Sequence, residues 1–397
     1  MHARAPASVP RLSARPLAAH GRSSTSVHHG APASSLPVLL LLQPARRRLS
    51  RLRGHAQDVY APDVSAASGQ AESLDAGCFL LQGLRDAQED AAALSVTPCG
   101  HFHFSAVFDG HGGTAASLFL RDHMASFVAK HLPGDPSALD EASARVAMEA
   151  AFAAADAALL VHLATCEPDQ RESGSTATVA LVGGGMLVVA NAGDSRAVLL
   201  KASGASPSDL TVDHRPAGKG AGAKAEAARV EARARAPHAS HIFSHAHSHR
   251  FFNQCVPSPF QSVGGWVRDG RVLGVLAVSR ALGDPEFKAH ESLLDVGVAR
   301  GLWRREEADT RRPLSAPPVV CTPHVSLVPL PSGQFSAIVL ATDGVWDVLS
   351  SAQAALFVRA ELGRGASAGE AAAALASHAV DRRKSKDNVG VVIVRLE

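Results

Sequence analysis

Two segments of this chain share one local pattern, an apolar run that stops at an Asp-Gly step. Residues 102–108 run into Asp109-Gly110, and residues 337–342 run into Asp343-Gly344. An ionised carboxylate at the inner end of a hydrophobic strand is costly unless a positive charge meets it. Converging carboxylates stay ionised only when cations accompany them. The sequence therefore predicts a site for a hard metal ion.

Further acids lie beside apolar runs in the same way. They are Glu89 and Asp90 before residues 91–96, Asp194 after residues 187–191, Asp347 four residues past Asp343, and Asp387 before residues 389–394. Each acid alone also fits an ordinary turn or helix cap, because Asp-Gly and Asp-Asn are common turn pairs. No histidine or cysteine cluster accompanies these acids, and a site of oxygen ligands alone favours Mg²⁺ or Mn²⁺ over Zn²⁺ or copper.

The charge of the chain is unevenly distributed. Its 397 residues allow one large domain with extensions or two small domains, and 46% hydrophobic with 19% charged residues is a globular composition. Residues 1–57 hold nine Arg and no Lys, Asp or Glu, so the remainder has 39 − 9 = 30 basic residues against 37 acidic ones. The body lacks a basic patch of the type that binds nucleic acid, and we expect no nucleic-acid partner.

The leader, residues 1–57, is rich in Arg, Ser, Ala and Pro. This composition is typical of an organelle transit peptide, although an ordinary disordered tail can have the same composition. We therefore expect an intracellular protein of plastid or mitochondrion, or otherwise of the cytosol. The apolar run 36–42 is too short to span a bilayer, and we expect no transmembrane helix. The five cysteines are scattered, odd in number and without a CxxC pair, which favours a reducing compartment.

The periodicity of apolar residues predicts the order of helices and strands. We expect strands at 78–82, 91–96, 101–108, 176–182, 186–191, 197–200, 319–321, 336–341 and 389–395, and helices at 114–131, 139–164, 225–234, 352–362 and 368–381. Gly183-Gly184-Gly185 is a hairpin signal. Runs of strands separated by pairs of helices indicate an α+β fold with antiparallel sheets. Residues 58–75 resemble a linker, and residues 291–318 an irregular polar stretch.

These motifs together resemble the PPM (PP2C-type) family of metal-dependent serine/threonine protein phosphatases. Eight motifs match in family order and span residues 76–397. They are Gly83-Leu84-Arg85 with Glu89-Asp90; Phe108-Asp109-Gly110-His111-Gly112-Gly113; Ser173-Gly174-Ser175-Thr176-Ala177; Asn191-Ala192-Gly193-Asp194-Ser195-Arg196; Asp213-His214-Arg215-Pro216; the segment from Leu276 to Asp284; Ala341-Thr342-Asp343-Gly344-Val345-Trp346-Asp347; and Asp387-Asn388. One such motif would be weak evidence, whereas eight in order are specific.

The resemblance implies a four-layer α-β-β-α sandwich, in which two antiparallel β-sheets are flanked by helix pairs, with the site at one end between the sheets. It implies one phosphatase domain over residues 76–397, a monomer that acts on phosphoproteins, and no membrane partner. The family's variable segment on the substrate side falls near a His-rich insertion at about residues 235–263. Within it His241, His245 and His249 have the spacing of a soft-metal site if helical, although a surface loop is the simpler interpretation.

The resemblance also assigns roles to single residues. It implies a two-metal centre of Mg²⁺ or Mn²⁺ on Asp90, Asp109, Asp343 and Asp387, with the backbone carbonyl of Gly110 as a further ligand and Glu89 acting through a water. Asp194 and Asp347 match positions that help hold a third, weaker ion. Arg85 matches the residue that binds the substrate phosphate, and His111 the proposed general acid. The two ions would activate a water that attacks phosphorus in line, without a covalent intermediate.

The chain departs from the family pattern at two positions that are not ligands. Gln88 stands where Met is usual, and Gly390 where Thr is common. Two other functions remain open. A catalytically weak pseudophosphatase would act as a binding or regulatory module, but it would be expected to lack ligands or Arg85, and all are present. A phosphatase of small phosphate metabolites would need the same centre, and the sequence discriminates poorly against it.

Overall fold

Two antiparallel sheets face each other in the computed structural model, which describes residues 56–57, 74–97, 100–133, 136–218, 221–231, 265–310 and 314–396. The chain divides into two units, Met1–Arg51 and Leu52–Glu397, and every described residue belongs to the second. Most of the predicted leader and linker, and the whole His-rich insertion, lie outside the described residues.

The first sheet has the strand order β1-β2-β16-β15-β9-β10, and the second has the order β14-β8-β7-β4-β3. The first contains β1 (Ala56–Gln57), β2 (Ala76–Leu81), β9 (Arg196–Lys201), β10 (Ser208–Asp209), β15 (Phe335–Ala341) and β16 (Val389–Arg395). The second contains β3 (Ala91–Val96), β4 (His103–Phe108), β7 (Ala177–Gly183), β8 (Met186–Ala192) and β14 (His324–Pro329). All neighbouring strands in these two sheets pair antiparallel, as predicted.

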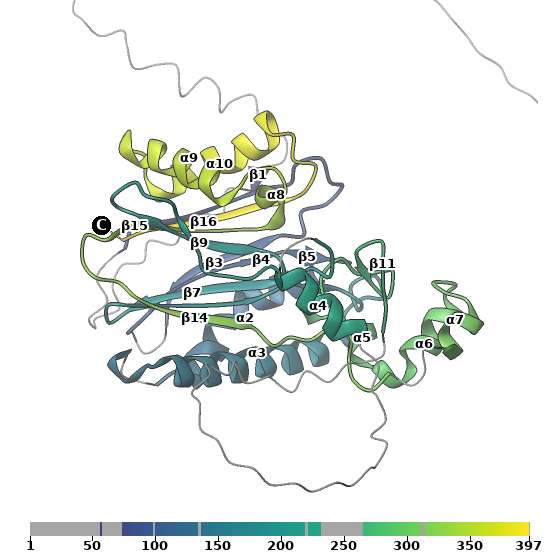
Figure 1. Ribbon diagram of the computed structural model, residues 1–397. Helices are drawn as coiled ribbons and strands as arrows, with labels where there is room; N and C mark the ends of the chain where they lie inside the picture. Colours follow the sequence, from purple (N-terminus) through teal and green to yellow (C-terminus); the bar gives the residue numbers. More distant parts are fainter. Residues whose placement is uncertain are drawn as a thin grey trace, which may run out of the picture. The chain divides into compact units, whose positions relative to one another are not determined.

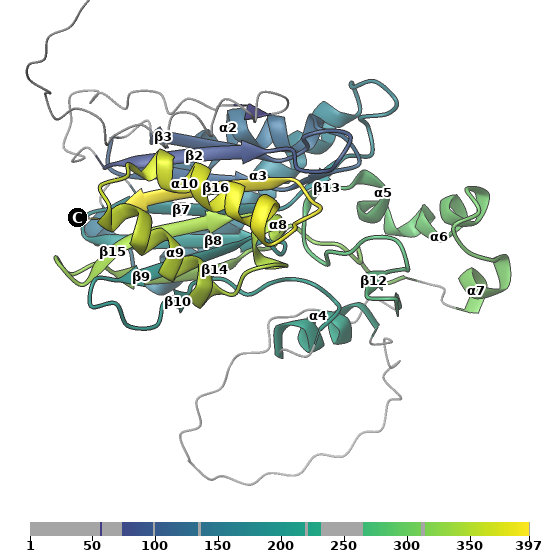
Figure 2. The same ribbon diagram turned by 90° about the horizontal axis from the view of Figure 1, so that it is seen from above.

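A pair of helices covers the outer face of each sheet (Figures 1 and 2). Helices α9 (Ser351–Gly363) and α10 (Ala368–Ser377) lie on the first sheet, and a five-residue π-helix, His378–Arg382, continues α10. Helices α2 (Ala115–His131) and α3 (Glu141–Leu163) lie on the second sheet. This arrangement confirms the predicted four-layer sandwich. Since both faces of each sheet are covered, the central strands are near-continuous apolar runs.

Local sequence signals explain where these elements begin and turn. Asp140, Ser350 and Ser367 form capping boxes at the starts of α3, α9 and α10. The predicted hairpin joins β7 to β8 through Gly184 and Gly185, whose φ angles of 57° and 72° suit a turn that most side chains disfavour.

The apolar helix α3 is long and hydrophobic enough to cross a membrane, but its buried residues pack against the second sheet and α2. Phe152, near its middle, is completely buried in that cluster. Packing of this kind is what a core helix of a sandwich requires.

Two predictions about the later part of the chain are wrong. Residues 319–321 are not a strand, because Val320 forms only an isolated bridge with Arg280. The strand of this region is β14, an edge strand with no fully buried residue, although Val325 and Leu327 pack against the core from one of its faces. The stretch 291–318 is not irregular throughout, since it contains most of α6 (His290–Ala299) and all of α7 (Arg305–Thr310).

A smaller group of elements lies beside one end of the sandwich (Figures 1 and 2). It contains α4 (Ala221–Glu231), β11 (Val267–Arg268), β12 (Arg271–Val272), α5 (Pro285–Lys288), α6 and α7. Helix α4 begins four residues earlier than predicted. The group has its own core around Trp266 and Trp303, whose rings meet edge to face at 5.5 Å.

Candidate metal centre

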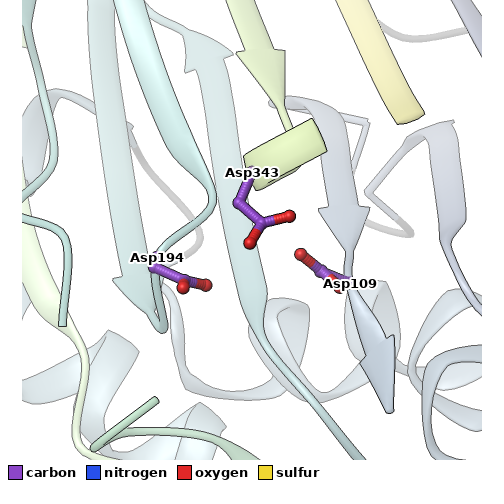
Figure 3. A group of neighbouring side chains, drawn as sticks. All are labelled: Asp109, Asp194 and Asp343. Carbon is purple, nitrogen blue, oxygen red and sulfur yellow. The ribbon is translucent and has the colours of Figure 1, made fainter. Parts of the chain in front are cut away.

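The carboxylates of Asp109, Asp194 and Asp343 converge at one end of the two sheets. Asp109 directly follows β4, Asp343 begins the short helix α8 (Asp343–Trp346) after β15, and Asp194 lies in the turn between β8 and β9. One oxygen from each lies within 4.8 Å of the others, and Figure 3 shows the three side chains pointing toward one another. Strand ends from both sheets therefore build the centre, since β4 and β8 belong to one sheet and β15 to the other.

Asp90 lies deeper in the same centre. Its side chain is buried and accepts a 2.8 Å hydrogen bond from Thr342 Oγ1. Thr342 Oγ1 in turn accepts from Gly390 N, so the first residues of β16 are joined to the centre. The sequence offered no role for Thr342, although it immediately precedes Asp343.

The pKa values of these carboxyl groups reflect their burial and, in second place, their mutual repulsion. Burial raises the pKa of Asp90 and of Asp109 well above the ordinary value, and neighbouring carboxylates raise it further. Burial likewise raises the pKa of Asp343 to about 7, with Asp194 adding to the rise and Arg215 opposing it. Oxygen donors that repel one another inside a protein fit a divalent cation, which would favour their ionised form.

Glu89 and Gly110 are held together at the edge of this centre. Glu89 Oε1 accepts a 2.7 Å hydrogen bond from Gly113 N, and Glu89 O accepts one of 2.6 Å from Ser117 Oγ. A Cβ atom on Gly110 would lie 2.3 Å from Glu89 O, so only glycine fits there. Asn388 accepts from Glu89 N with its Oδ1 at 2.9 Å, which ties the loop to the start of β16.

Arg85 and Asp387 meet at the solvent side of the centre. Arg85 Nη2 donates to Asp387 Oδ2 at 2.7 Å, and 54% of the Arg85 side chain is exposed. Asp387 is close enough that its charge raises the pKa of Asp90, Asp109 and Asp343. An exposed guanidinium held beside a group of acids can bind an anion that enters from solvent.

A small three-stranded sheet positions His111. It has the order β13-β6-β5, formed by Leu282–Gly283, Gly174–Ser175 and Gly110–His111, which lie far apart in sequence. It brings His111 Nε2 to 2.8 Å from Asp284 Oδ1. Burial lowers the pKa of His111, but Asp284, together with Asp194 and Glu89, raises it, and the net shift is upward. Sequence reasoning placed Asp284 in a motif without giving it a role.

Asp284 is itself tightly constrained. It is 3% exposed, and its φ of 50° is a left-handed value that side chains rarely adopt. Its Oδ2 is buried with no hydrogen-bond partner among the described residues. A Cβ atom on Gly174 would lie 2.4 Å from its carboxylate, so the neighbouring glycine makes room for it. A strained, buried acid of this kind indicates a functional constraint.

Arg215 is the second functional residue that sequence reasoning missed. Its guanidinium donates to Asp194, to Asp343 Oδ2 at 2.5 Å and to Asp347 Oδ1 at 2.8 Å. Asp347 N donates to Asp343 O at 2.8 Å, so these two acids, four residues apart in the sequence, lie one helical turn apart. The only sequence signal for Arg215 was its place in the segment Asp213-His214-Arg215-Pro216.

Comparisons with known proteins find relatives over most of the chain. A family model described as "Protein phosphatase 2C" matches residues 71–234 and 260–389. "Protein phosphatase 2C 57" of Arabidopsis thaliana is 31% identical over 385 residues, which cover 96% of this chain and 89% of the relative. "Probable protein phosphatase 2C 68" of Oryza sativa subsp. japonica is 31% identical over 344 residues, which cover 81% of this chain and 77% of the relative.

Solved structures resemble the fold at lower identity. A phosphatase from a pathogenic strain of Toxoplasma gondii is 22% identical with a TM-score of 0.55, covering 82% of this chain and 95% of its own. A serine-threonine phosphatase 2C from Toxoplasma gondii is 19% identical with a TM-score of 0.54, covering 83% of this chain and 96% of its own. The residues 235–259 between the two segments that match the family model fall within the predicted insertion.

Proposed function

This chain belongs to the protein phosphatase 2C family, a family of metal-dependent serine/threonine protein phosphatases, and from that premise we propose that it hydrolyses phosphoserine and phosphothreonine with two divalent cations. The observation that carries this proposal is the convergence of buried and half-buried carboxylates from both sheets at one end of the sandwich.

The chemistry of the donor set supports Mg²⁺ or Mn²⁺ as the ions. Every side-chain donor in the centre is a carboxylate oxygen, which suits hard cations. The residues that would hold the two ions are Asp90, Asp109, Asp343, Asp387 and the carbonyl of Gly110, with Glu89 contributing through water. Asp194 and Asp347 would contribute to a third, weaker site. When bound, the ions would lower the pKa of an attacking water and offset charge on the phosphoryl oxygens.

The side chains around the centre would orient the substrate and move its proton. Arg85 would bind the phosphate, because its fork of N–H groups is exposed and already lies against an anionic oxygen. Asp284 holds His111 through Nε2, which leaves Nδ1 as the nitrogen that would donate a proton to the departing Ser or Thr oxygen. An alkoxide leaving group needs this proton, because it is a strong base.

Hydrolysis of a phosphothreonine peptide by the full chain would test the proposal. After treatment with a chelator, we would titrate Mn²⁺ and Mg²⁺ and measure phosphate release by the wild type, Asp109→Ala and Asp343→Ala. Asp122→Ala is a matched control, because this acid pairs with Arg121 on the exposed face of α2. We expect metal-dependent release that is lost in the two centre variants and retained in the control.

Two results would contradict the proposal. The absence of turnover at any metal concentration, from protein that circular dichroism shows to be folded, would favour a pseudophosphatase. Faster release from sugar phosphates than from the peptide would favour a metabolite phosphatase.

We further propose that the leader directs the protein to an organelle, because residues 1–57 combine nine Arg with no acidic residue. Fluorescent fusions of the full chain, with and without this leader, would show organelle import only when it is present. Equal distribution of both fusions in the cytosol would contradict this.

A further inference from the structure

Arg215 is placed among the acids where a cation would be expected. The outer acids, Asp194, Asp343 and Asp347, each accept a hydrogen bond from a different nitrogen of its guanidinium. One positive charge therefore faces three carboxylates. The planar fork suits this task, because its donors lie in fixed directions.

The segment that carries Arg215 is anchored on the loop that carries Asp194. His214 N donates to Gly193 O at 2.9 Å, and Gly193 N donates back to His214 Nδ1 at 3.2 Å. The preceding residue, Asp213, accepts two hydrogen bonds from Arg196 at 3.1 and 2.6 Å. The backbone that leads into Arg215 is thus fixed, whereas an arginine side chain has several rotatable bonds.

The charges of the outer acids make Arg215 and a metal ion alternatives. Asp194 is 3% exposed, so its charge must be met inside the protein. Arg215 meets that need, because its guanidinium donates hydrogen bonds to both Asp194 and Asp343. An ion bound to the same oxygens would occupy the space that the guanidinium fills. The Arg215 side chain is 30% exposed, which leaves it a route toward solvent.

We propose that Arg215 is a built-in cation that competes with a divalent metal ion for the outer acids. It neutralises them when the metal concentration is low, and a third ion binds only by displacing it. The affinity of that site then depends on this chain's arginine as well as on its acids. This inference rests on the proposed metal centre.

Metal binding, rather than activity, tests the inference directly. Mn²⁺ would be titrated calorimetrically into the chelator-treated full chain, as wild type and as Arg215→Gln. The glutamine removes the charge, so the weakest Mn²⁺ site should tighten by about tenfold, within the range usual for coupled ligands. Arg300→Gln is the matched control, because Arg300 also bridges two acids, Glu172 and Glu286, outside the centre. Its binding isotherm should match that of the wild type.

Thermal unfolding supplies a second readout. With chelator present, Arg215→Gln should melt below the wild type, since the outer acids then lack any counter-charge, and saturating Mn²⁺ should restore most of the difference. If Arg215→Gln folds only in Mn²⁺, the inference is supported. If it folds in neither condition, Arg215→Lys is measured in its place. A lysine keeps the charge but cannot bridge three acids, so the weakest Mn²⁺ site should tighten partially.

The outcomes separate this inference from the proposed function. A wild type that binds no Mn²⁺ would overturn both. A wild type that binds Mn²⁺, with an unchanged weakest site in Arg215→Gln, would overturn only the role of Arg215. An equal loss of melting temperature with and without Mn²⁺ would show that the arginine stays in place beside the ions, and would also overturn it.

Discussion

Lowering the pH should destabilise the protein through His214. This side chain is 2% exposed, and burial lowers its pKa to about 3, with Arg280 and His324 lowering it further and Glu226 opposing them. The unfolded chain therefore binds a proton below pH 6.5 that the folded chain does not. The free energy of unfolding is therefore unaffected by His214 above pH 6.5, and it decreases as the pH falls from 6.5 toward 3. Each pH unit in this range costs about 1.36 kcal/mol, so at pH 5, which is 1.5 units below 6.5, the free energy of unfolding is lower by about 2 kcal/mol.

Urea unfolding followed by circular dichroism would measure this loss. The free energy of unfolding would be compared at pH 7 and pH 5, with chelator present, for the wild type and His214→Asn. The asparagine keeps an acceptor for the N–H of Gly193 but cannot gain the charge. Other titrating groups are shared by both proteins, so they cancel in the comparison. The wild type should lose about 2 kcal/mol more than the variant between the two pH values. Equal losses would refute the assignment of a buried, neutral imidazole.

Three substitutions test other parts of the structure. Asp284→Asn should slow phosphate release from a phosphothreonine peptide by about 100-fold, and from an aryl phosphate much less, because an aryl leaving group needs no proton. Equal losses in kcat for the two substrates would contradict the role of Asp284 in positioning His111. Gly110→Ala should lower the free energy of unfolding by about 1–3 kcal/mol in urea, because its Cβ would lie 2.3 Å from Glu89 O, while Gly363→Ala, with open space around it, should not destabilise. Phe152→Ala should cost about 3–5 kcal/mol in the same assay, and a loss below about 1 kcal/mol would show that this core position is loosely packed.

Most of the secondary structure followed from local patterns. The strands at 91–96 and 389–395 are apolar runs long enough to form strands and bounded by polar residues, and both lie where predicted. The edge strand β14 was missed because its alternation of Val325, Ser326 and Leu327 covers only a few residues, and the prediction placed the strand at the apolar run just before it. Helices α6 and α7 were missed because they pack on a small side core around Trp303 rather than on the main sheets. Tertiary contacts, rather than helical periodicity, decide such short elements.

Some residues of the candidate site could likewise be recognised from the sequence, and others could not. Acids that end or begin strands could be recognised from the sequence, because a carboxylate beside an apolar run requires a compensating cation. The partners of those acids could not be recognised. Asp284 lies 173 residues from His111, and Arg215 lies 128 residues from Asp343.

The sequence by itself determined most strands of the two sheets, the paired helices, and the acids that the strands carry to their ends. The tertiary structure alone decided which charges meet. Sheet order joins β4, β8 and β15 at one end of the sandwich, and the small sheet β13-β6-β5 brings Asp284 to His111. The physical reason is that the two kinds of signal act over different distances along the chain. Hydrophobic periodicity acts over a few residues, whereas a salt bridge depends on distance in space, which only the folded chain defines.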